Sequence, residues 1–202
     1  MRNVPLLLCA ALLFTQIACF PKEGERIVAK ISFVSGTVLL NGKNARPDDF
    51  VKFGDVIETK ARSACAIIID SQNIIGMREE SVLVYKIKKD EATVDLKNGF
   101  LGIIIKNRKN IPNFKVTTAT VTASVRGTAL FLGTESPNST YTCICNGIIH
   151  YHPEGRAKAE RHAAAHHKGI TYTEKGGIVF DVPAGMKHHT DEDVENLAKM
   201  IG

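Results

Sequence analysis

Short runs of alternating hydrophobic and polar residues follow one another between Ile27 and Thr142. The runs are rich in Val, Ile, Thr, Phe and Leu, residue types that fit the pleated surface of a strand. Turn residues separate the runs about every ten residues, a spacing typical of all-β folds. These turn signals are Ser35-Gly36, Asn41-Gly42, Phe53-Gly54-Asp55, 70–73, Lys97-Asn98-Gly99 and 110–113. The pattern predicts a mainly β fold, a sandwich, roll or barrel, with Asn41-Gly42 as its strongest hairpin turn.

The pattern changes after Pro153, where helix-forming residues replace strand-forming ones. Segment 154–168 reads EGRAKAERHAAAHHK, contains no β-branched residue and is closed by Gly169, so it predicts a short helix. A strand pair, 170–173 and 178–182, is expected next, followed by a last helix over 191–201 that Thr190 caps. The apolar positions of this last helix fall at helical spacing, which predicts that it docks on the β domain. They are Val194, Leu197, Ala198 and Ile201.

The first residues of the chain predict export. Arg2 precedes an apolar run, Val4 to Phe14, which has the length of a signal peptide and is too short to span a bilayer. A lipoprotein signal also needs a small residue directly before a cysteine, and Ala18 precedes Cys19, although Gln16 stands where Leu is usual. We therefore expect a signal peptide over 1–18, a lipidated Cys19 and a linker over 19–26. The alternative is an ordinary cleaved signal peptide in which Cys19 has no special role.

Composition and charge limit the remaining possibilities. The 202 residues are 44% hydrophobic, which suits one ordinary domain with a short appendage. We divide the chain after its signal and linker into a β domain, 27–151, and a His-rich C-terminal extension, 152–202. The net charge of +5 comes from 26 basic and 21 acidic residues interleaved along the chain. Nucleic-acid binding usually needs a concentrated basic stripe, so no nucleic-acid partner is expected.

The five cysteines separate into different classes. Cys9 lies in the signal peptide and Cys19 is the expected lipidation site, which leaves three in the mature chain, an odd number for a disulfide framework. Cys65 lies in an apolar run and is expected to be a buried, unpaired thiol. Cys143 and Cys145 remain as a pair that needs its own explanation.

All seven histidines lie between His150 and His189, directly after this cysteine pair. If Asn146-Gly147 forms a hairpin turn, Cys143, Cys145, His150 and His152 project from one face of a strand pair. His162 and His166 would share a face of the predicted helix over 154–168.

Thiolates together with imidazoles are ligands suited to zinc, or to copper or iron in a suitable geometry. The alternatives to a metal site are a small strained disulfide between Cys143 and Cys145, and solvated side chains with no special role. A third group at the start of the last helix combines His188, His189 and Asp191.

The order of several motifs resembles the FecR domain over roughly Ile27 to Tyr151. The motifs are Ser35-Gly36-Thr37-Val38, Phe53-Gly54-Asp55-Val56-Ile57-Glu58-Thr59, Val94-Asp95-Leu96-Lys97-Asn98-Gly99, Phe114-Lys115-Val116-Thr117-Thr118 and Val125-Arg126-Gly127-Thr128-Ala129-Leu130. Two positions depart from the family, since Asp70-Ser71-Gln72 stands where Asp-Gly-Ser is usual and Thr118 where proline is frequent. The resemblance implies an extracytoplasmic antiparallel β-sandwich or roll with a short helical C-terminal extension.

The resemblance also bears on function. The FecR domain is known in iron-uptake regulators that relay receptor occupancy to a cytoplasmic anti-sigma segment. Because no cytoplasmic segment or transmembrane span is evident here, we do not expect that relay role to carry over. The tail resembles the extension of some FecR-domain lipoproteins in three motifs: C-x-C-x-G, His-His and M-x-x-H-T-D. That similarity implies a ligand set different from the hairpin set, namely Cys143, Cys145, His166, His167 and His189.

The expected function is that of a membrane-anchored, extracytoplasmic binding, scaffold or sensory module, on the periplasmic or outer surface of the cell envelope. Its expected partners are the membrane, through the lipid, and an envelope or outer-membrane protein. Zinc, copper or iron is the expected cofactor, ahead of haem iron. A metal-dependent or thiol redox enzyme and a purely structural lipoprotein are the alternatives. Neither a nucleophile elbow nor an HExxH motif supports an enzyme.

Overall fold

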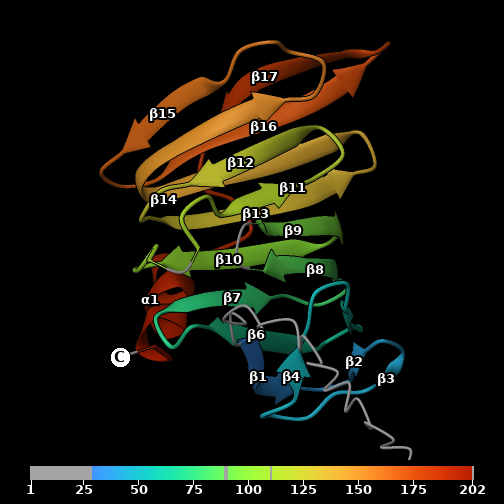
Figure 1. Ribbon diagram of the computed structural model, residues 1–202. Helices are drawn as coiled ribbons and strands as arrows, with labels where there is room; N and C mark the ends of the chain where they lie inside the picture. Colours follow the sequence, from blue (N-terminus) through green and yellow to red (C-terminus); the bar gives the residue numbers. More distant parts are fainter. Residues whose placement is uncertain (1–28, 89–90, 110, 202) are drawn as a thin grey trace, which may run out of the picture.

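The computed structural model describes residues 29–88, 91–109 and 111–201 (Figure 1). The predicted signal peptide, Cys19 and the linker lie outside these residues. The described part is mainly β, with one helix, α1 (Asp191–Lys199), near the C-terminus. No helix in this part is long and apolar enough to span a membrane.

The strands are short in the first half of the chain and longer in the second. The first ten are β1 (Ala29–Ser35), β2 (Val38–Leu40), β3 (Lys43–Asn44), β4 (Phe50–Val51), β5 (Val56–Thr59), β6 (Ala64–Ile69), β7 (Asn73–Met77), β8 (Val82–Lys88), β9 (Glu91–Asn98) and β10 (Phe100–Ile105). The rest are β11 (Lys115–Thr117), β12 (Val121–Val125), β13 (Ala129–Ser136), β14 (Ser139–Pro153), β15 (Glu160–Ala164), β16 (Lys168–Lys175) and β17 (Ile178–Ala184).

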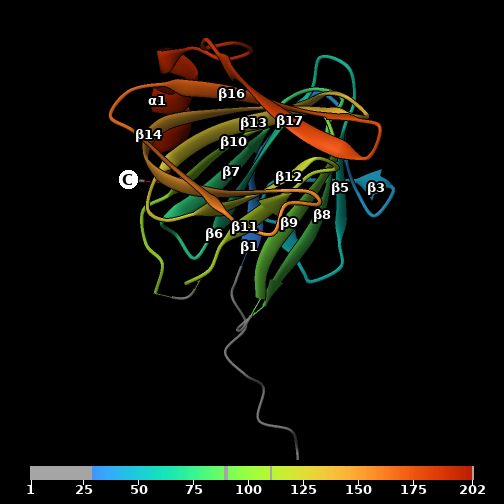
Figure 2. The same ribbon diagram turned by 90° about the horizontal axis from the view of Figure 1, so that it is seen from above.

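Two sheets face each other and share the long strand β14 (Figure 2). The first sheet has the order β4-β1-β6-β7-β10-β13-β14-β16-β17. The second has the order β3-β2-β5-β8-β9-β11-β12-β14-β15. Neighbouring strands are antiparallel except β9 and β11. The prediction of a mainly β, antiparallel sandwich or roll is confirmed.

Apolar side chains fill both the space between the sheets and a smaller region outside the first sheet. Alternate residues of a strand point to opposite faces, and the inward ones, such as Ile67, Tyr85 and Tyr151, are fully buried between the sheets. Outward residues of the first sheet, including Ile74 and Phe131, form the second cluster, against which α1 packs. This outer face carries the candidate site.

The predicted hairpin at Asn146-Gly147 is wrong. Both residues lie within β14, which runs unbroken through them and passes from the first sheet to the second. Gly147 has a φ of +94° at this crossing, and the Asn146 side chain accepts a hydrogen bond from the Ala129 amide. An Asn-Gly pair tolerates positive φ in a bulge as well as in a turn, and here the segments on its two sides pair with different strands.

The predicted helix over 154–168 is also wrong. This segment forms turns and then β15, which pairs with residues 147–151 of β14. Helix propensity is a weak preference that tertiary pairing overrides, and β14 offers β15 a free edge in the second sheet. His162 therefore packs against the Tyr151 ring, at 5.6 Å between centroids, and does not share a helix face with His166. The predicted boundary between residues 151 and 152 falls inside β14.

Three other predictions for the extension are confirmed. The expected strand pair corresponds to β16 and β17, joined at Gly176-Gly177. Thr190 caps α1, because its hydroxyl accepts a hydrogen bond from the Asp193 amide while the Asp193 carboxylate accepts one from the Thr190 amide. The apolar side of α1 docks on the outer face of the first sheet.

Cys65 is a buried free thiol, as predicted. Burial raises the pKa of this thiol from its ordinary value of 9.0 to about 12.

At pH 8 we expect roughly 1000-fold less thiolate at Cys65 than at an exposed cysteine, and therefore correspondingly slow alkylation by iodoacetamide in the folded protein. The stabilisation gained from keeping this thiol neutral is complete below the ordinary pKa and is lost as the pH rises toward 12. Peptide mass spectrometry after timed alkylation, with a urea-unfolded sample as reference, measures the rate, and equal labelling of both samples would contradict the expectation.

Candidate metal centre

Cys143 and Cys145 project from the same face of β14 because they are two residues apart on a strand. Ile144 between them points into the core between the sheets, while both cysteines point to the outer face of the first sheet. Their exposed fractions are 0% for Cys143 and 6% for Cys145. Neither sulfur is in a disulfide. The C-x-C spacing therefore places two free thiols side by side beneath the C-terminal extension.

His167 approaches the first thiol from the segment between β15 and β16. Its Nδ1 lies 3.4 Å from the Cys143 sulfur. Its Nε2 lies 2.5 Å from a carboxylate oxygen of Asp191, the first residue of α1. One ring nitrogen thus faces sulfur while the other is held by a carboxylate.

His189 approaches the second thiol from the residues that precede α1. Its Nε2 lies 3.6 Å from the Cys145 sulfur, and its Nδ1 lies 2.8 Å from the Lys187 carbonyl oxygen. The ring stacks on Phe131 at 4.3 Å between centroids, and the residue is only 6% exposed. Both histidines therefore show the arrangement usual in metal sites, where the nitrogen away from the metal donates to an oxygen that fixes the ring.

Tyr141 positions the segment that carries His189. Its hydroxyl donates to the Gly185 carbonyl at 3.0 Å and accepts from the Lys187 amide at 2.8 Å. Neither Tyr141 nor Phe131 was among the residues predicted for this site. Tyr141 had a local signal, since it precedes the two cysteines at the same two-residue spacing on β14. Phe131 had none, because only strand pairing brings β13 beside the cysteines.

The four ligand atoms lie close enough together to bind one metal ion. The two sulfurs and the two nearest ring nitrogens all lie within 4.8 Å of one another. Zinc bonds of about 2.3 Å to sulfur and about 2.0–2.1 Å to nitrogen put neighbouring S and N ligands about 3.5 Å apart in a tetrahedron. The sulfur–nitrogen distances of 3.4 and 3.6 Å agree with that value. The donor set and its dimensions therefore fit zinc.

The local electrostatics favour one thiolate. The hydrogen bond with Cys145, with further ones to His189, His167 and Tyr141, outweighs burial and lowers the pKa of Cys143. The same bond to Cys143, together with burial, raises the pKa of Cys145. Burial alone would lower the pKa of His167, but Asp191 and Cys143 raise it. Thiolate is the form of cysteine that binds metals, so the site is prepared for a cation.

The remaining predicted ligands lie elsewhere. His150 and His152 are on the part of β14 that belongs to the second sheet, where they pair with Ser124 and Thr122 of β12. Burial and nearby arginines lower the pKa of His150. His166 adjoins the site, but its side chain is 71% exposed, and its Nε2 lies 3.9 Å from Asp191. Of the seven predicted metal ligands, the structure brings together Cys143, Cys145, His167 and His189.

Asp191 is expected to strengthen metal binding without touching the metal. Its carboxylate holds His167 and lies on an exposed surface. Removing such an outer partner typically weakens metal affinity by about 10- to 100-fold, so we expect a loss of this size for Asp191→Ala. Glu192→Ala, which removes the next acidic residue of the same helical turn, is the matched control. Competition with a chromogenic chelator measures both affinities, and equal affinities would contradict a positioning role for Asp191.

The fold and the site together define a two-sheet β domain with a buried thiol–imidazole cluster on its outer face. Residues 55–148 match the model of the family described as FecR protein. These residues therefore form a domain of the FecR type. The matched span includes both cysteines of the site and ends before both histidines, which belong to the C-terminal extension.

Comparison with solved structures shows where a similar fold occurs. The fold is similar to that of two crystal structures, at 1.65 and 2.50 Å resolution, described as a "putative anti-sigma factor" from Parabacteroides distasonis. Each has a TM-score of 0.51 and 10% sequence identity, and the match covers 64% of this chain and 60% of the other. The chain therefore spans about 60% of the length of these structures. A search of the curated proteins found no match.

Proposed function

We propose that this protein is an extracytoplasmic binding or sensory module of the FecR type, tethered to a membrane through Cys19, whose C-terminal extension holds one transition-metal ion. The observation that carries the metal assignment is the convergence of Cys143, Cys145, His167 and His189, whose ligand atoms lie within 4.8 Å of one another. Zinc is the metal that this S2N2 set fits best, with copper and iron as the other candidates. When bound, the ion would cross-link the FecR domain to residues 152–202.

The surroundings of the four residues favour a metal over a catalytic dithiol. Redox-active cysteines need access to a substrate thiol or disulfide, whereas both sulfurs here are covered. Four ligands from the protein leave no open position, which is typical of structural or sensory zinc sites and atypical of catalytic ones. The geometry therefore supports a binding role for the site.

The FecR domain supports the wider role. The resemblance to the FecR domain implies a signalling role outside the cytoplasm. The solved structures with a similar fold are described as a "putative anti-sigma factor", which is a regulatory protein. Partners of such a domain are proteins at the membrane or in the envelope. We propose a role of this kind, in which metal occupancy is the state that the module reports.

Elemental analysis of the purified protein tests the metal assignment. Protein prepared with reduced cysteines and without chelator is expected to contain close to one equivalent of zinc, copper or iron. Chelation should remove the metal, and titration with zinc should restore one equivalent. Metal-free protein that takes up none of these three metals on titration would contradict the assignment.

The anchor has a separate test. We expect the wild-type chain to incorporate labelled fatty acid in a bacterial host and to fractionate with membranes, because two or more acyl chains anchor firmly. Cys19→Ala should lose both properties, while Cys65→Ala should keep them. Membrane association that is unchanged in Cys19→Ala would contradict a lipid anchor at this residue.

A further inference from the structure

Helix α1 depends on its contacts for stability. It contains nine residues, none of which is buried, and only Ile201 beyond its end is covered. Isolated helices of this length are marginal in water. Contacts with the first sheet must therefore supply the free energy that keeps this helix folded and docked.

The first attachment is a socket for Leu197. Gly76 of β7 and Gly102 of β10 lie directly opposite each other in the sheet. A Cβ atom would lie 2.9 Å from a Leu197 methyl carbon at Gly76, and 3.2 Å from one at Gly102. The paired glycines thus leave a depression that the Leu197 side chain fills.

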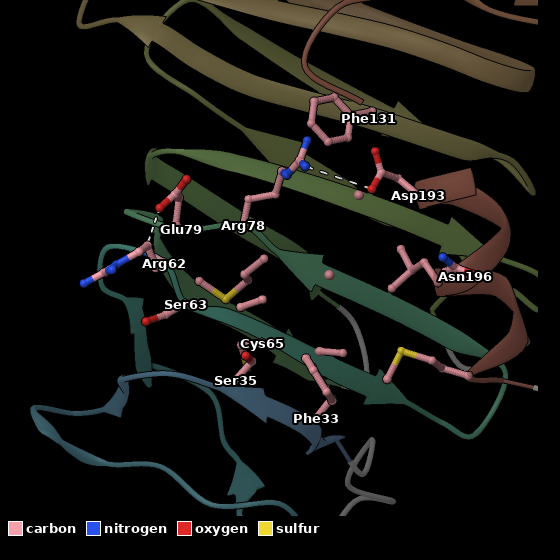
Figure 3. Close-up of a pocket in the computed structure, with 17 residues that line it drawn as sticks. Phe33, Ser35, Arg62, Ser63, Cys65, Arg78, Glu79, Phe131, Asp193 and Asn196 are labelled. Carbon is pink, nitrogen blue, oxygen red and sulfur yellow. Dashed lines mark hydrogen bonds and ion pairs between the residues drawn. The ribbon is translucent and has the colours of Figure 1, made fainter. Parts of the chain in front are cut away.

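The second attachment involves Arg78, which donates to the His188 carbonyl and lies 4.0 Å from the Asp193 carboxylate (Figure 3). The side chains of Arg78 and Asp193 are 47% and 46% exposed. Ion pairs this exposed contribute little to stability. This contact therefore sets the orientation of the first helical turn but adds little to the free energy of docking.

The third attachment is the metal centre itself. His189 immediately precedes the capping residue of α1, and Asp191 is the first helical residue. His189 faces Cys145 of β14, and Asp191 holds His167, which faces Cys143 of the same strand. A bound ion would therefore tie the start of α1 to β14.

The helix also forms one wall of a groove. This groove, of about 520 Å³, lies between α1 and strands β1, β6 and β7 (Figure 3). Leu197 and Met200 line it on the helix side, and Phe33 and Met77 line it on the sheet side. Displacement of α1 would open the groove and uncover apolar residues of the second cluster, including Ile74 and Phe131.

We infer that α1 is a metal-controlled cover of the first sheet: metal binding holds it in the Gly76–Gly102 socket, and metal loss releases it. This inference rests on the proposed metal site and adds its structural consequence. Metal binding and helix docking are then thermodynamically linked: docking raises the affinity for the metal by the same factor by which the metal favours docking. Release of α1 exposes an apolar surface. Loss of the metal thereby produces a structural change that a partner protein can recognise.

Hydrogen exchange with and without zinc tests the inference on the full chain. Removal of zinc is expected to speed amide exchange in residues 191–199 by at least about tenfold, as expected for a locally unfolded segment. Exchange in β6 and β7 should change far less. If zinc binds with one equivalent and exchange in α1 is the same in both states, the cover is disproved while the metal site stands. If zinc does not bind at all, the proposed metal site fails first.

Variants in the socket test the linkage from the other side. Leu197→Ala removes the side chain that fills the socket, and Gly76→Val fills the socket in a strand position whose backbone suits valine. Both should weaken zinc affinity about fivefold or more, within the usual range of coupling between sites. Glu195→Ala, on the exposed side of the same helix, should bind zinc like the parent chain. Parent-like affinity in Leu197→Ala, whose change leaves every strand intact, would overturn the inference even if Gly76→Val fails to fold.

Discussion

Cys143→Ser is expected to bind zinc at least roughly 100-fold more weakly than the parent chain. A serine hydroxyl does not ionise near neutral pH and is a poor ligand for zinc compared with a thiolate. Loss of an outer partner alone already costs about 10- to 100-fold in affinity, so loss of a direct ligand should cost more. Equilibrium dialysis followed by elemental analysis measures the change.

Cys65 provides the matched control for that experiment. It is also a buried free thiol, but it lies on β6, away from the four ligands. Cys65→Ser should bind close to one equivalent of zinc even if it unfolds more readily. Retention of full zinc affinity in Cys143→Ser would exclude this residue as a ligand and would leave Cys145 and the histidines as the remaining ligands.

Gly99→Val is expected to lower the free energy of unfolding by about 3 kcal/mol or more. Gly99 lies between β9 and β10 with a φ of +86°, where a β-branched residue is strained. A Cβ atom there would also lie 2.2 Å from the Ser81 hydroxyl oxygen and 2.5 Å from the Ser81 Cα. Ser81 cannot move away easily, because it is buried and its hydroxyl accepts from the Phe100 amide. Urea unfolding followed by circular dichroism measures the loss.

Gly42→Val separates the two causes of that loss. Gly42 has a φ of +76°, similar to that of Gly99, but nothing lies within 4 Å of its Cβ position. It should therefore show only the backbone strain, about 1–3 kcal/mol. Equal losses in the two variants would show that the contact with Ser81 contributes nothing and that backbone strain at positive φ accounts for the whole effect.

The candidate metal centre is built from two parts of the chain. The FecR-type domain supplies both thiols, on the face of the first sheet that is directed away from the main core. The extension adds two histidines and a helix whose apolar side packs on this face. In the proposed function, the domain is the platform and the extension is the part that responds to metal.

The sequence was a good guide to features that depend on neighbouring residues. Strand-forming runs separated by turn residues predicted the mainly β fold, and Thr190 predicted the start of α1, because turn preference and capping are local properties. C-x-C predicted two side chains on one face for the same reason. The resemblance to the FecR domain was confirmed by the family match over 55–148.

The tertiary structure decided which histidines join the cysteines. Asn146-Gly147 has the same local preference in a hairpin and in a bulge, and only the pairing of β14 with four different strands selects the bulge. That selection sends His150 and His152 to the second sheet. His167 and His189 are 24 and 44 residues away from their cysteine partners. Pairing of β16 with β14 brings His167 to Cys143, and the hydrogen bonds of Tyr141 hold the segment that carries His189. Local sequence determined the chemistry that each residue can offer, and long-range tertiary contacts determined which of them meet.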